Sequence, residues 1–221
     1  MATDSSAEMQ KQRLGMVNGQ LRTRGVVDQD VLAAFLETPR ERFVARGFEE
    51  LAYLDRRLPA LGAKERRLLG PATLARLLQG AAIQAGERVL DVGGGSGYGA
   101  ALLAAMGAKV VMLESDPGAA AVARQEVAGK GVDVIEGPLE AGAPSRAPFD
   151  VIVIEGAFKV RPEALLAQLA ENGRLVGVDA MSGTPQAVLC EKNDGAFSRR
   201  ALVEASADLL DGFEPVESFV F

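Results

Sequence analysis

The sequence predicts an α/β fold in which helices cover both faces of a mainly parallel, doubly wound sheet. Short, almost unbroken apolar segments, such as residues 88–92, 109–114 and 149–154, alternate with longer segments of helical periodicity. Continuous apolar strands are typical of parallel sheets, because both of their faces are buried. In such folds, ligands bind beyond the carboxyl ends of the strands. We therefore expect the functional site at that edge of the sheet.

The N-terminal part of the chain is expected to be largely helical. Residues 1–8 are mostly polar and predict a disordered tail, whereas residues 9–70 predict a helical extension of the core. Within this extension, Asp28 or Asp30 can cap a helix, because a short acidic side chain accepts hydrogen bonds from the first free N–H groups. Residues 40–52 predict one further short helix.

Residues 71–221 are expected to form the core, within one structural domain overall, and Pro71 suits the first position of its first helix. Near the C-terminus, strand candidates follow one another without helices of comparable length. This change predicts an antiparallel edge on a sheet of about seven strands. The helices are expected at residues 71–83, 100–106, 117–130 and 161–170, and the strands at 88–92, 109–114, 132–136, 149–154, 174–178, 187–192, 197–203 and 213–221.

The composition excludes several classes of function. The 221 residues include 24 Lys and Arg, 30 Asp and Glu, and no His, for a net charge of −6. Without histidine, Ser-His-Asp or Cys-His catalysis and His-ligated zinc are excluded. The acidic balance argues against nucleic acid as a partner. The single cysteine, the lack of a basic-apolar leader and the lack of an apolar stretch of spanning length predict a cytoplasmic protein outside the membrane.

The strongest motif lies between a strand and a helix, at residues 89–98, which read VLDVGGGSGY. Its alternate glycines suit a sharp turn with a ligand packed against the backbone, and the following helix N-terminus offers unpaired N–H groups. Asp91 precedes the glycines. Glu114 ends the next strand, 114 − 91 = 23 residues later, close to the offset at which an acid reaches ribose hydroxyls. The motif therefore predicts a nucleotide-type ligand.

Two nucleotide ligands and a purely structural turn compete for this motif. Nicotinamide dinucleotides require G-x-G-x-x-G/A, which Gly95, Gly97 and Ala100 match, but this match starts late for the turn. The pattern E/D-x-G-x-G-x-G fits in register when it starts at Asp91. That pattern belongs to S-adenosylmethionine-dependent methyltransferases, in which Asp91 would receive the amino end of the methionine moiety. S-adenosyl-L-methionine is thus the favoured cofactor, with S-adenosyl-L-homocysteine as its product.

Several segments beyond the glycine loop carry a wider resemblance. They are Met16-Val17, Gln20-Leu21-Arg22, Gly25-Val26, Val31-Leu32, Pro39-Arg40, Phe43-Val44, Ala52-Tyr53-Leu54-Asp55, Leu58-Pro59, Pro148-Phe149-Asp150 and Gly173-Arg174-Leu175-Val176. On these segments the chain resembles the protein-L-isoaspartate O-methyltransferase family. The resemblance implies a Rossmann-like class I methyltransferase fold and methyl transfer to the carboxylate of isoaspartyl residues in proteins or peptides, as protein repair. We expect a monomer or a homodimer.

The resemblance also implies which residues bind the cofactor. After its third strand the family has Gly-Asp, whose acid reaches the adenine amino group, whereas this chain has Gly137-Pro138. The side-chain contact is lost, but the N–H of Leu139 can still serve the adenine ring. The expected cofactor-binding residues are Asp91, Gly93, Gly95, Ser96, Gly97, Tyr98, Glu114 and Leu139.

Two departures from the family concern the methyl acceptor. The family carries Ser-Gln-Pro before its cofactor helix, and its serine lines the active site, whereas this chain has Leu69-Gly70-Pro71. Glu155 stands at the end of the fourth strand, where the family usually has a small polar residue. We hypothesise that Glu155 is catalytic and that the basic residues Lys64, Arg66 and Arg67 help to define a changed acceptor site. A glutamate there would repel a carboxylate and suit an amine or a hydroxyl. The alternatives are therefore a relative with a different acceptor, or a catalytically inactive S-adenosylmethionine-binding protein.

Overall fold

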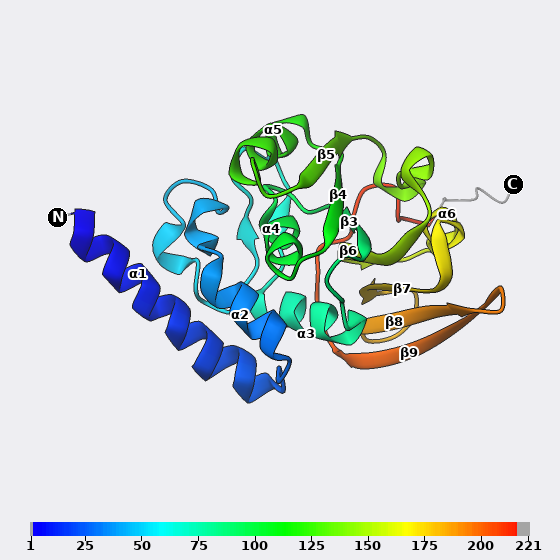
Figure 1. The fold of residues 1–221 in the computed structure, drawn as a ribbon, viewed down its shortest axis with the longest axis horizontal. Helices are drawn as coiled ribbons and strands as arrows, with labels where there is room; N and C mark the ends of the chain where they lie inside the picture. The colour runs from blue at the N-terminus through cyan, green and yellow to red at the C-terminus, as the bar shows by residue number, and fades with distance from the viewer. Residues whose placement is uncertain (1, 216–221) are drawn as a thin grey trace, which may run out of the picture.

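The computed structural model describes residues 2–215 and begins with a long helix, α1 (Ala2–Met16), along one edge of the molecule (Figure 1). This helix already includes residues 2–8, for which the sequence predicts a disordered tail. The physical reason is that neither glycine nor proline occurs before Gly15, so no residue interrupts the helix. The tail prediction is therefore corrected from Ala2 onward.

Short helical turns connect α1 to a second helix, as the sequence predicts for this region. Of the two candidate caps, Asp28 is the one used, because its carboxylate accepts hydrogen bonds from the backbone N–H groups two and three residues further on. The elements are a π-helical turn η1 (Val17–Leu21), a 3-10 turn η2 (Arg22–Arg24) and helix α2 (Gln29–Glu37).

Residues 40–52 form two separate 3-10 turns instead of the single helix expected from the sequence. Gly47 lies between the turns with a φ of 86°, a left-handed conformation that ends a helix. A two-stranded antiparallel hairpin follows and leads into the core. These elements are η3 (Arg40–Arg42), η4 (Glu49–Leu51), β1 (Leu58–Pro59) and β2 (Arg67–Leu68).

Seven strands form the central sheet in the order β5-β4-β3-β6-β7-β8-β9. The pairs from β5 to β7 are parallel, and β8 and β9 add an antiparallel edge. The expected mainly parallel sheet with an antiparallel edge is thus confirmed. The strands are β3 (Arg88–Val92), β4 (Lys109–Glu114), β5 (Val132–Glu136), β6 (Phe149–Phe158), β7 (Leu169–Asp179), β8 (Gln186–Asn193) and β9 (Ala196–Glu204).

One expected helix is shorter than the periodicity suggests. The structure ends α6 at Ala167, whereas the sequence predicts a helix to residue 170. From Leu169 the chain already belongs to β7, and Leu169 pairs with Phe149 of β6. Both side chains are buried, so burial in the sheet outweighs helix propensity at this position.

Helices cover both faces of the sheet, as Figure 1 shows. Helices α3, α4 and α5 pack on one face, while α6 and the 3-10 turn η5 contribute to the apolar cluster on the other. The structure ends α5 at Glu126, four residues before the end that the sequence predicts. The bounds are α3 (Pro71–Ala81), α4 (Tyr98–Ala105), α5 (Pro117–Glu126), α6 (Glu163–Ala167), η5 (Leu139–Ala141) and η6 (Pro144–Arg146).

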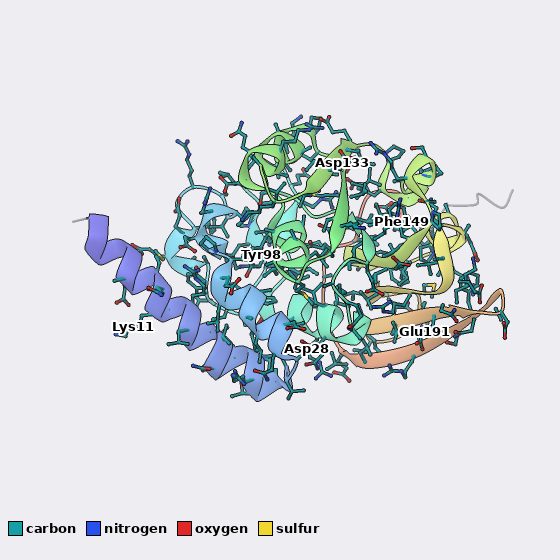
Figure 2. The ribbon with its side chains drawn as sticks, viewed as in Figure 1. Lys11, Asp28, Tyr98, Asp133, Phe149 and Glu191 are labelled. Atoms are coloured by element: carbon teal, nitrogen blue, oxygen red, sulfur yellow. The ribbon has the colours of Figure 1, made fainter. Side chains whose placement is uncertain are left out.

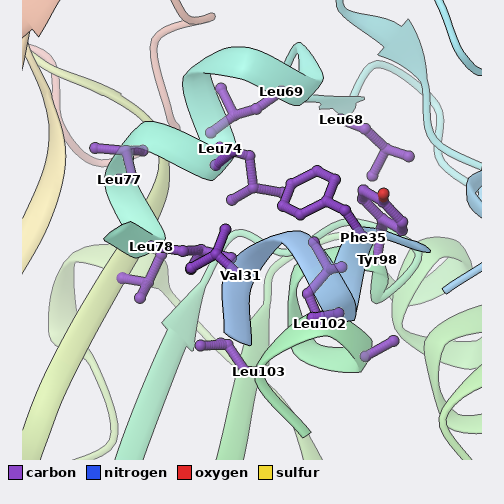
Figure 3. Close-up of a cluster of buried hydrophobic side chains, with 14 of the residues drawn as sticks. Val31, Phe35, Leu68, Leu69, Leu74, Leu77, Leu78, Tyr98, Leu102 and Leu103 are labelled. Atoms are coloured by element: carbon purple, nitrogen blue, oxygen red, sulfur yellow. The ribbon is translucent and has the colours of Figure 1, made fainter. Parts of the chain in front are cut away.

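The N-terminal helices share one apolar cluster with the core. Val31 and Phe35 of α2 lie beside Leu74 of α3 and Leu102 of α4 in the cluster that Figure 3 shows. The ring of Phe35 meets the ring of Tyr98 edge to face, with centroids 5.9 Å apart. This packing fixes the first turn of α4, which follows the glycine loop, against the N-terminal extension.

After β9 the chain returns to the end of β6. Leu209 forms a single parallel bridge with Ala157, and the N–H of Leu210 donates to the carbonyl oxygen of Ala157. The strand expected at residues 213–221 is not formed up to residue 215, and its remaining residues lie outside the described part. Among residues 2–215, no helix is both long and apolar enough to cross a bilayer.

Candidate active site

A cavity of about 500 Å³ opens at the carboxyl ends of β4 and β6. This is the edge at which doubly wound folds bind ligands, as the sequence predicts. Its walls come from the β1–β2 hairpin, the turn after β4 and the segment after β9, and they carry charges of both signs. The lining residues are Arg57, Lys64, Glu65, Arg66, Arg67, Leu69, Ser115, Asp116, Pro117, Glu155, Asp208, Leu209, Leu210 and Asp211.

The glycine loop, residues 93–97, is buried against side chains that also line the cavity. Three of its glycines have φ values of 75°, 61° and 94°, which other residues rarely adopt, so the shape of the loop depends on glycine. A Cβ atom on Gly93 would lie 3.0 Å from a methyl group of Leu210, and one on Gly95 would lie 3.3 Å from Cγ of Arg66. The protein's own side chains therefore cover the loop in this conformation.

Asp91, near the end of β3, and Glu155, inside β6 and three residues before its end, form a buried carboxyl pair. Asp91 pairs with Val153 in the sheet register, so Glu155, two residues further along β6, projects from the same face. Helix α4 packs directly over it, because a Cβ atom on Gly99 would lie only 1.6 Å from Oε1 of Glu155. Within residues 2–215, neither carboxylate oxygen of Asp91 nor Oε1 of Glu155 has a hydrogen-bond partner.

The surroundings raise the pKa of both carboxyl groups. Burial is the main cause in each case, and the neighbouring charge of Glu155 helps to hold the pKa of Asp91 well above its usual range. Burial raises the pKa of Glu155 to about 7, although the positive charges of Arg40 and Arg66 oppose the shift. Two adjacent buried carboxyls cannot both ionise easily, so the pair retains at least one proton near neutral pH.

Glu114, at the end of β4, is fully buried and organises the neighbouring turns. Its Oε2 accepts a hydrogen bond from the N–H of Gly95 at 2.8 Å. Its Oε1 accepts from the N–H groups of Ser115 and Asp116 at 2.8 Å and 2.9 Å. Nε of Arg66 lies 3.4 Å from the same oxygen. The acid expected at the ribose is thus placed beside the glycine loop, with a cation already against it.

Three of the expected cofactor-binding side chains point away from the cavity. The hydroxyl of Ser96 donates to the carbonyl oxygen of Phe43. Tyr98 lies inside the molecule (Figure 2), and the guanidinium of Arg40 packs over its ring. The side chain of Leu139 joins the apolar cluster on the other face of the sheet. These side chains support the site from behind, which leaves only their backbone groups for a ligand.

The residues hypothesised to form the acceptor site do come together. Lys64, Arg66 and Arg67 line the cavity on the hairpin side, and Leu69 lines it near the start of α3. Glu155 lines the same cavity, although it is only 3% exposed. The structure therefore brings the two departures from the family pattern into one site.

The structure adds charged residues that sequence reasoning did not single out for the site. Arg40 is fully buried, and its NH2 group donates to the carbonyl oxygen of Leu69 at 2.9 Å. Its only sequence signal is the Pro39-Arg40 match. Arg57 forms an ion pair with Asp208, a residue 151 positions away. No local pattern could predict that pair, because only the return of the chain after β9 brings the two together.

The residues present suit the expected cofactor, S-adenosylmethionine. The buried Asp91 carboxyl, without a hydrogen-bond partner in the described part of the chain, favours a cationic group such as an ammonium. The glycine loop allows close approach of a ligand to the backbone, and Glu114 can accept hydrogen bonds from hydroxyl groups. Arg66 and Leu210 lie against the loop, so a ligand that contacts the same sides of these glycines has to displace them.

The chain is similar to one family of methyltransferases in both sequence and structure. The family model described as Protein-L-isoaspartate(D-aspartate) O-methyltransferase matches residues 11–206. A protein-L-isoaspartate O-methyltransferase of Gloeobacter violaceus is 43% identical over 73% of this chain and 79% of its own length. One from Methanoregula boonei is 37% identical over 87% of this chain and 89% of its own length. A solved protein-L-isoaspartate O-methyltransferase matches with a TM-score of 0.79 at 26% identity, over 90% of this chain and 66% of its own. A Plasmodium falciparum structure in complex with S-adenosyl-L-homocysteine, 20% identical over 89% of this chain and 96% of its own, matches in fold with a TM-score of 0.73.

Proposed function

The chain belongs to the protein-L-isoaspartate O-methyltransferase family, and on this premise we propose that it transfers the methyl group of S-adenosylmethionine to the carboxylate of isoaspartyl residues in proteins. This reaction would make the protein a repair enzyme for damaged proteins or peptides. Members of the family are S-adenosylmethionine-dependent enzymes. The matched residues, 11–206, include every residue that we assign to the cofactor.

In this proposal, the end of the sheet holds the cofactor. Asp91 binds the amino group of the methionine moiety, and Glu114 binds the ribose hydroxyls. The backbone of the glycine loop, residues 93–97, lies against the ligand, and the N–H of Leu139 serves the adenine ring. The bound cofactor supplies an electrophilic sulfonium methyl group.

The acceptor needs little help from acid–base chemistry. A carboxylate with a pKa of about 4 is ionised at neutral pH, so the absence of histidine is no obstacle. The protein's contribution is to hold the acceptor in line with the methyl group, and such positioning supplies much of the rate. Two of the cations that line the cavity, Arg57 and Arg66, are paired with acids. Lys64 and Arg67 form no ion pair within residues 2–215, so they are the cations that can meet an anionic acceptor.

The observation that carries the proposal is the buried Asp91 carboxyl beside the glycine loop, which has no hydrogen-bond partner among residues 2–215. Calorimetric titration with S-adenosylmethionine tests it in the wild type and in Asp91→Asn. We expect the substitution to weaken binding at least about tenfold, equivalent to about 1.4 kcal/mol. The matched control is Asp133→Asn, because Asp133 is a half-exposed strand residue paired with Arg146. Equal affinities of wild type and Asp91→Asn would contradict the role of Asp91.

Methyl transfer to an isoaspartyl peptide and to its aspartyl counterpart tests the acceptor. We expect transfer to the isoaspartyl peptide only. If the protein binds the cofactor but transfers no methyl group to the isoaspartyl peptide, the repair function is excluded. If it does not bind the cofactor, enzymatic activity as a methyltransferase is excluded.

One observation favours a second candidate, a methyltransferase with a different acceptor. Leu69 stands where the family has a serine hydroxyl, and it lines the cavity together with Glu155. Transfer to amine- or hydroxyl-bearing peptides, with none to the isoaspartyl peptide, would support this candidate.

A further inference from the structure

We propose that Glu155 is an acceptor-binding acid, which in its neutral form donates a hydrogen bond from its O–H to the isoaspartyl carboxylate. It thereby replaces the hydroxyl that the site lacks at Leu69. This inference rests on the proposed function and deepens it, because it assigns the group that recognises the acceptor. On the sequence alone, Glu155 is expected to be ionised and to repel a carboxylate, whereas its buried surroundings in the structure favour the protonated form.

Glu155 has a fixed position between the sheet and α4. Glu155 follows Val151 and Val153 on one face of β6, and Asp91 lies on the same face of the neighbouring strand. Gly99 leaves the room that the carboxyl group occupies under α4. Glu155 also lines the cavity, together with residues of the β1–β2 hairpin. A side chain held between two strands and a helix presents its carboxyl group to the cavity in a fixed direction.

Several other charged groups surround Glu155. Asp91 on β3 and Glu114 on β4 are acids, and both are fully buried. The cation Arg66 is engaged by Glu114, and the cation Arg40 by the carbonyl oxygen of Leu69. The groups that change the pKa of Glu155 are Asp91, Glu114, Arg40 and Arg66, and Tyr98 lies close enough to interact with its charge. The other charged residues that line the same cavity are Arg57, Lys64, Glu65, Arg67, Asp116, Asp208 and Asp211.

The buried surroundings of Glu155 favour a proton on its carboxyl group. Glu155 lies beside the Asp91 carboxyl, and Oε1 of Glu155 and both oxygens of Asp91 lack hydrogen-bond donors within the part of the chain that the structure describes. A buried carboxyl group in such a place is more stable in its neutral form, and a neutral acid can donate a hydrogen bond. Burial raises the pKa of Glu155 to about 7, so the neutral form is the main one below neutral pH.

A protonated Glu155 can donate a hydrogen bond to the carboxylate of the methyl acceptor. A hydrogen bond between a neutral acid and a carboxylate is charge-assisted and short, and it fixes the direction of the acceptor oxygen. Above its pKa the same residue carries a negative charge and repels the carboxylate. Recognition of an isoaspartyl group by Glu155 must therefore weaken as the pH rises, whereas recognition by a serine hydroxyl would not.

Peptide binding without cofactor tests the inference. A fluorescently labelled isoaspartyl peptide is titrated by anisotropy between about pH 5.5 and pH 8.5 at constant ionic strength. A second peptide carries a carboxamide in place of the isoaspartyl carboxylate. We expect the wild type to lose about tenfold in affinity for the first peptide between pH 6 and pH 8, and to bind the second with little change.

Two variants separate the hydrogen bond from a general charge effect. Glu155→Gln carries a permanent N–H donor of the same shape, so it should keep its pH 6 affinity for the isoaspartyl peptide at pH 8. Glu65→Gln removes a charge from the same cavity and should keep the wild-type slope. A flat wild-type profile, a slope that persists in Glu155→Gln, or no peptide binding at any pH would overturn the inference. If Glu155→Gln fails to fold, the pH dependence of the wild type's affinity for the two peptides still tests the inference.

Methyl transfer, measured on the same samples, keeps this inference apart from the proposed function. A pH-dependent affinity without transfer would support the role of Glu155 and contradict the proposed function. Transfer to the isoaspartyl peptide, together with an affinity that does not change with pH, would support the proposed function and contradict the role of Glu155.

Discussion

Nε of Arg66 lies 3.4 Å from Oε1 of Glu114, the acid that we propose for the cofactor's ribose. The Arg66 side chain is only 9% exposed, and its Cγ lies beside Gly95 of the glycine loop. Its NH2 group also reaches the hydroxyl of Ser115 at 3.1 Å and the carboxylate of Asp211 at 3.4 Å. Arg66 thus lies against both the loop and Glu114, and it links the segment after β9 to the site.

Removal of this side chain should strengthen cofactor binding. In Arg66→Ala the ligand no longer has to displace the guanidinium, so we expect the dissociation constant for S-adenosylmethionine to fall by about tenfold, or about 1.4 kcal/mol. The free variant should be less stable by about 1–3 kcal/mol, because Glu114 loses its buried cation. Calorimetry and urea unfolding measure the two effects. Arg67→Ala is the matched control, since Arg67 lines the same cavity. Weaker binding in Arg66→Ala would contradict the prediction and make Arg66 a ligand-binding residue.

The carboxyl pair should make the stability of the ligand-free protein fall as the pH rises through the weakly acidic range. Between about pH 4.5 and pH 7 the folded state keeps a proton on Glu155 that the unfolded chain has released. The free energy of unfolding therefore decreases over this interval, by about 3 kcal/mol for a shift of this size. The raised pKa of Asp91 acts in the same direction.

Urea unfolding of the wild type and of Glu155→Gln at several pH values isolates this contribution, because glutamine does not titrate. We expect the wild type to lose stability relative to the variant as the pH rises from 4.5 to 7. A difference that stays constant, or that changes in the opposite direction, would show that Glu155 is ionised throughout.

The sequence predicts the strands best where an apolar run is bounded by glycine or charge. The run at 88–92 and the one at 109–114 are strands with those bounds in the structure. The motif at 89–98 likewise locates the edge of the sheet where the cavity opens. Local pattern suffices in these cases because burial on both faces leaves few alternatives for such a segment.

Other features depend on contacts between distant segments and could not be predicted locally. Leu169 has helical neighbours in sequence, yet it pairs with Phe149 in the sheet. Tyr98 follows the glycine loop, but it packs against α2 because Phe35 meets its ring there. The raised pKa of Glu155 is a further example, since its main cause is burial, and α4, which covers the carboxyl group, lies fifty or more residues away in the sequence.

Gly99→Ala should destabilise the protein, although alanine is usually the better helix former. The usual gain is about 0.5–1 kcal/mol. A Cβ atom at this position, however, would lie 1.6 Å from Oε1 and 2.6 Å from Cδ of Glu155. Relief of that overlap has to move a buried carboxyl group, so we expect a net loss of about 1–3 kcal/mol.

Unfolding in urea measures this loss, with Gly15→Ala as the control. Gly15 is an exposed residue of α1, and a Cβ atom there would contact nothing within 4 Å, so its substitution should be neutral or stabilising. The loss at Gly99 should shrink in the background of Glu155→Ala, which removes the overlapping atoms. An equal loss in both backgrounds would mean that a different contact is responsible.

Tyr98→Phe should leave the protein at least as stable as the wild type. The hydroxyl of Tyr98 is fully buried and has no hydrogen-bond partner within residues 2–215. Its removal eliminates an uncompensated polar group, which favours the folded state by about 1 kcal/mol. The ring itself remains, together with its contacts to Phe35 and Phe43. Because the hydroxyl points away from the cavity, the affinity for S-adenosylmethionine should not change.

Tyr53→Phe provides the opposite case within the same chain. The hydroxyl of Tyr53 accepts a hydrogen bond from Nε of Arg13 at 3.0 Å and donates one to the carboxylate of Glu41. Its removal leaves both charged partners without this contact, so we expect a loss of about 1–3 kcal/mol. Thermal and urea unfolding of the two variants compare the effects directly. A loss of more than about 1 kcal/mol in Tyr98→Phe would contradict the prediction and indicate that the hydroxyl is bonded by the neighbouring Arg40 or by a buried water molecule.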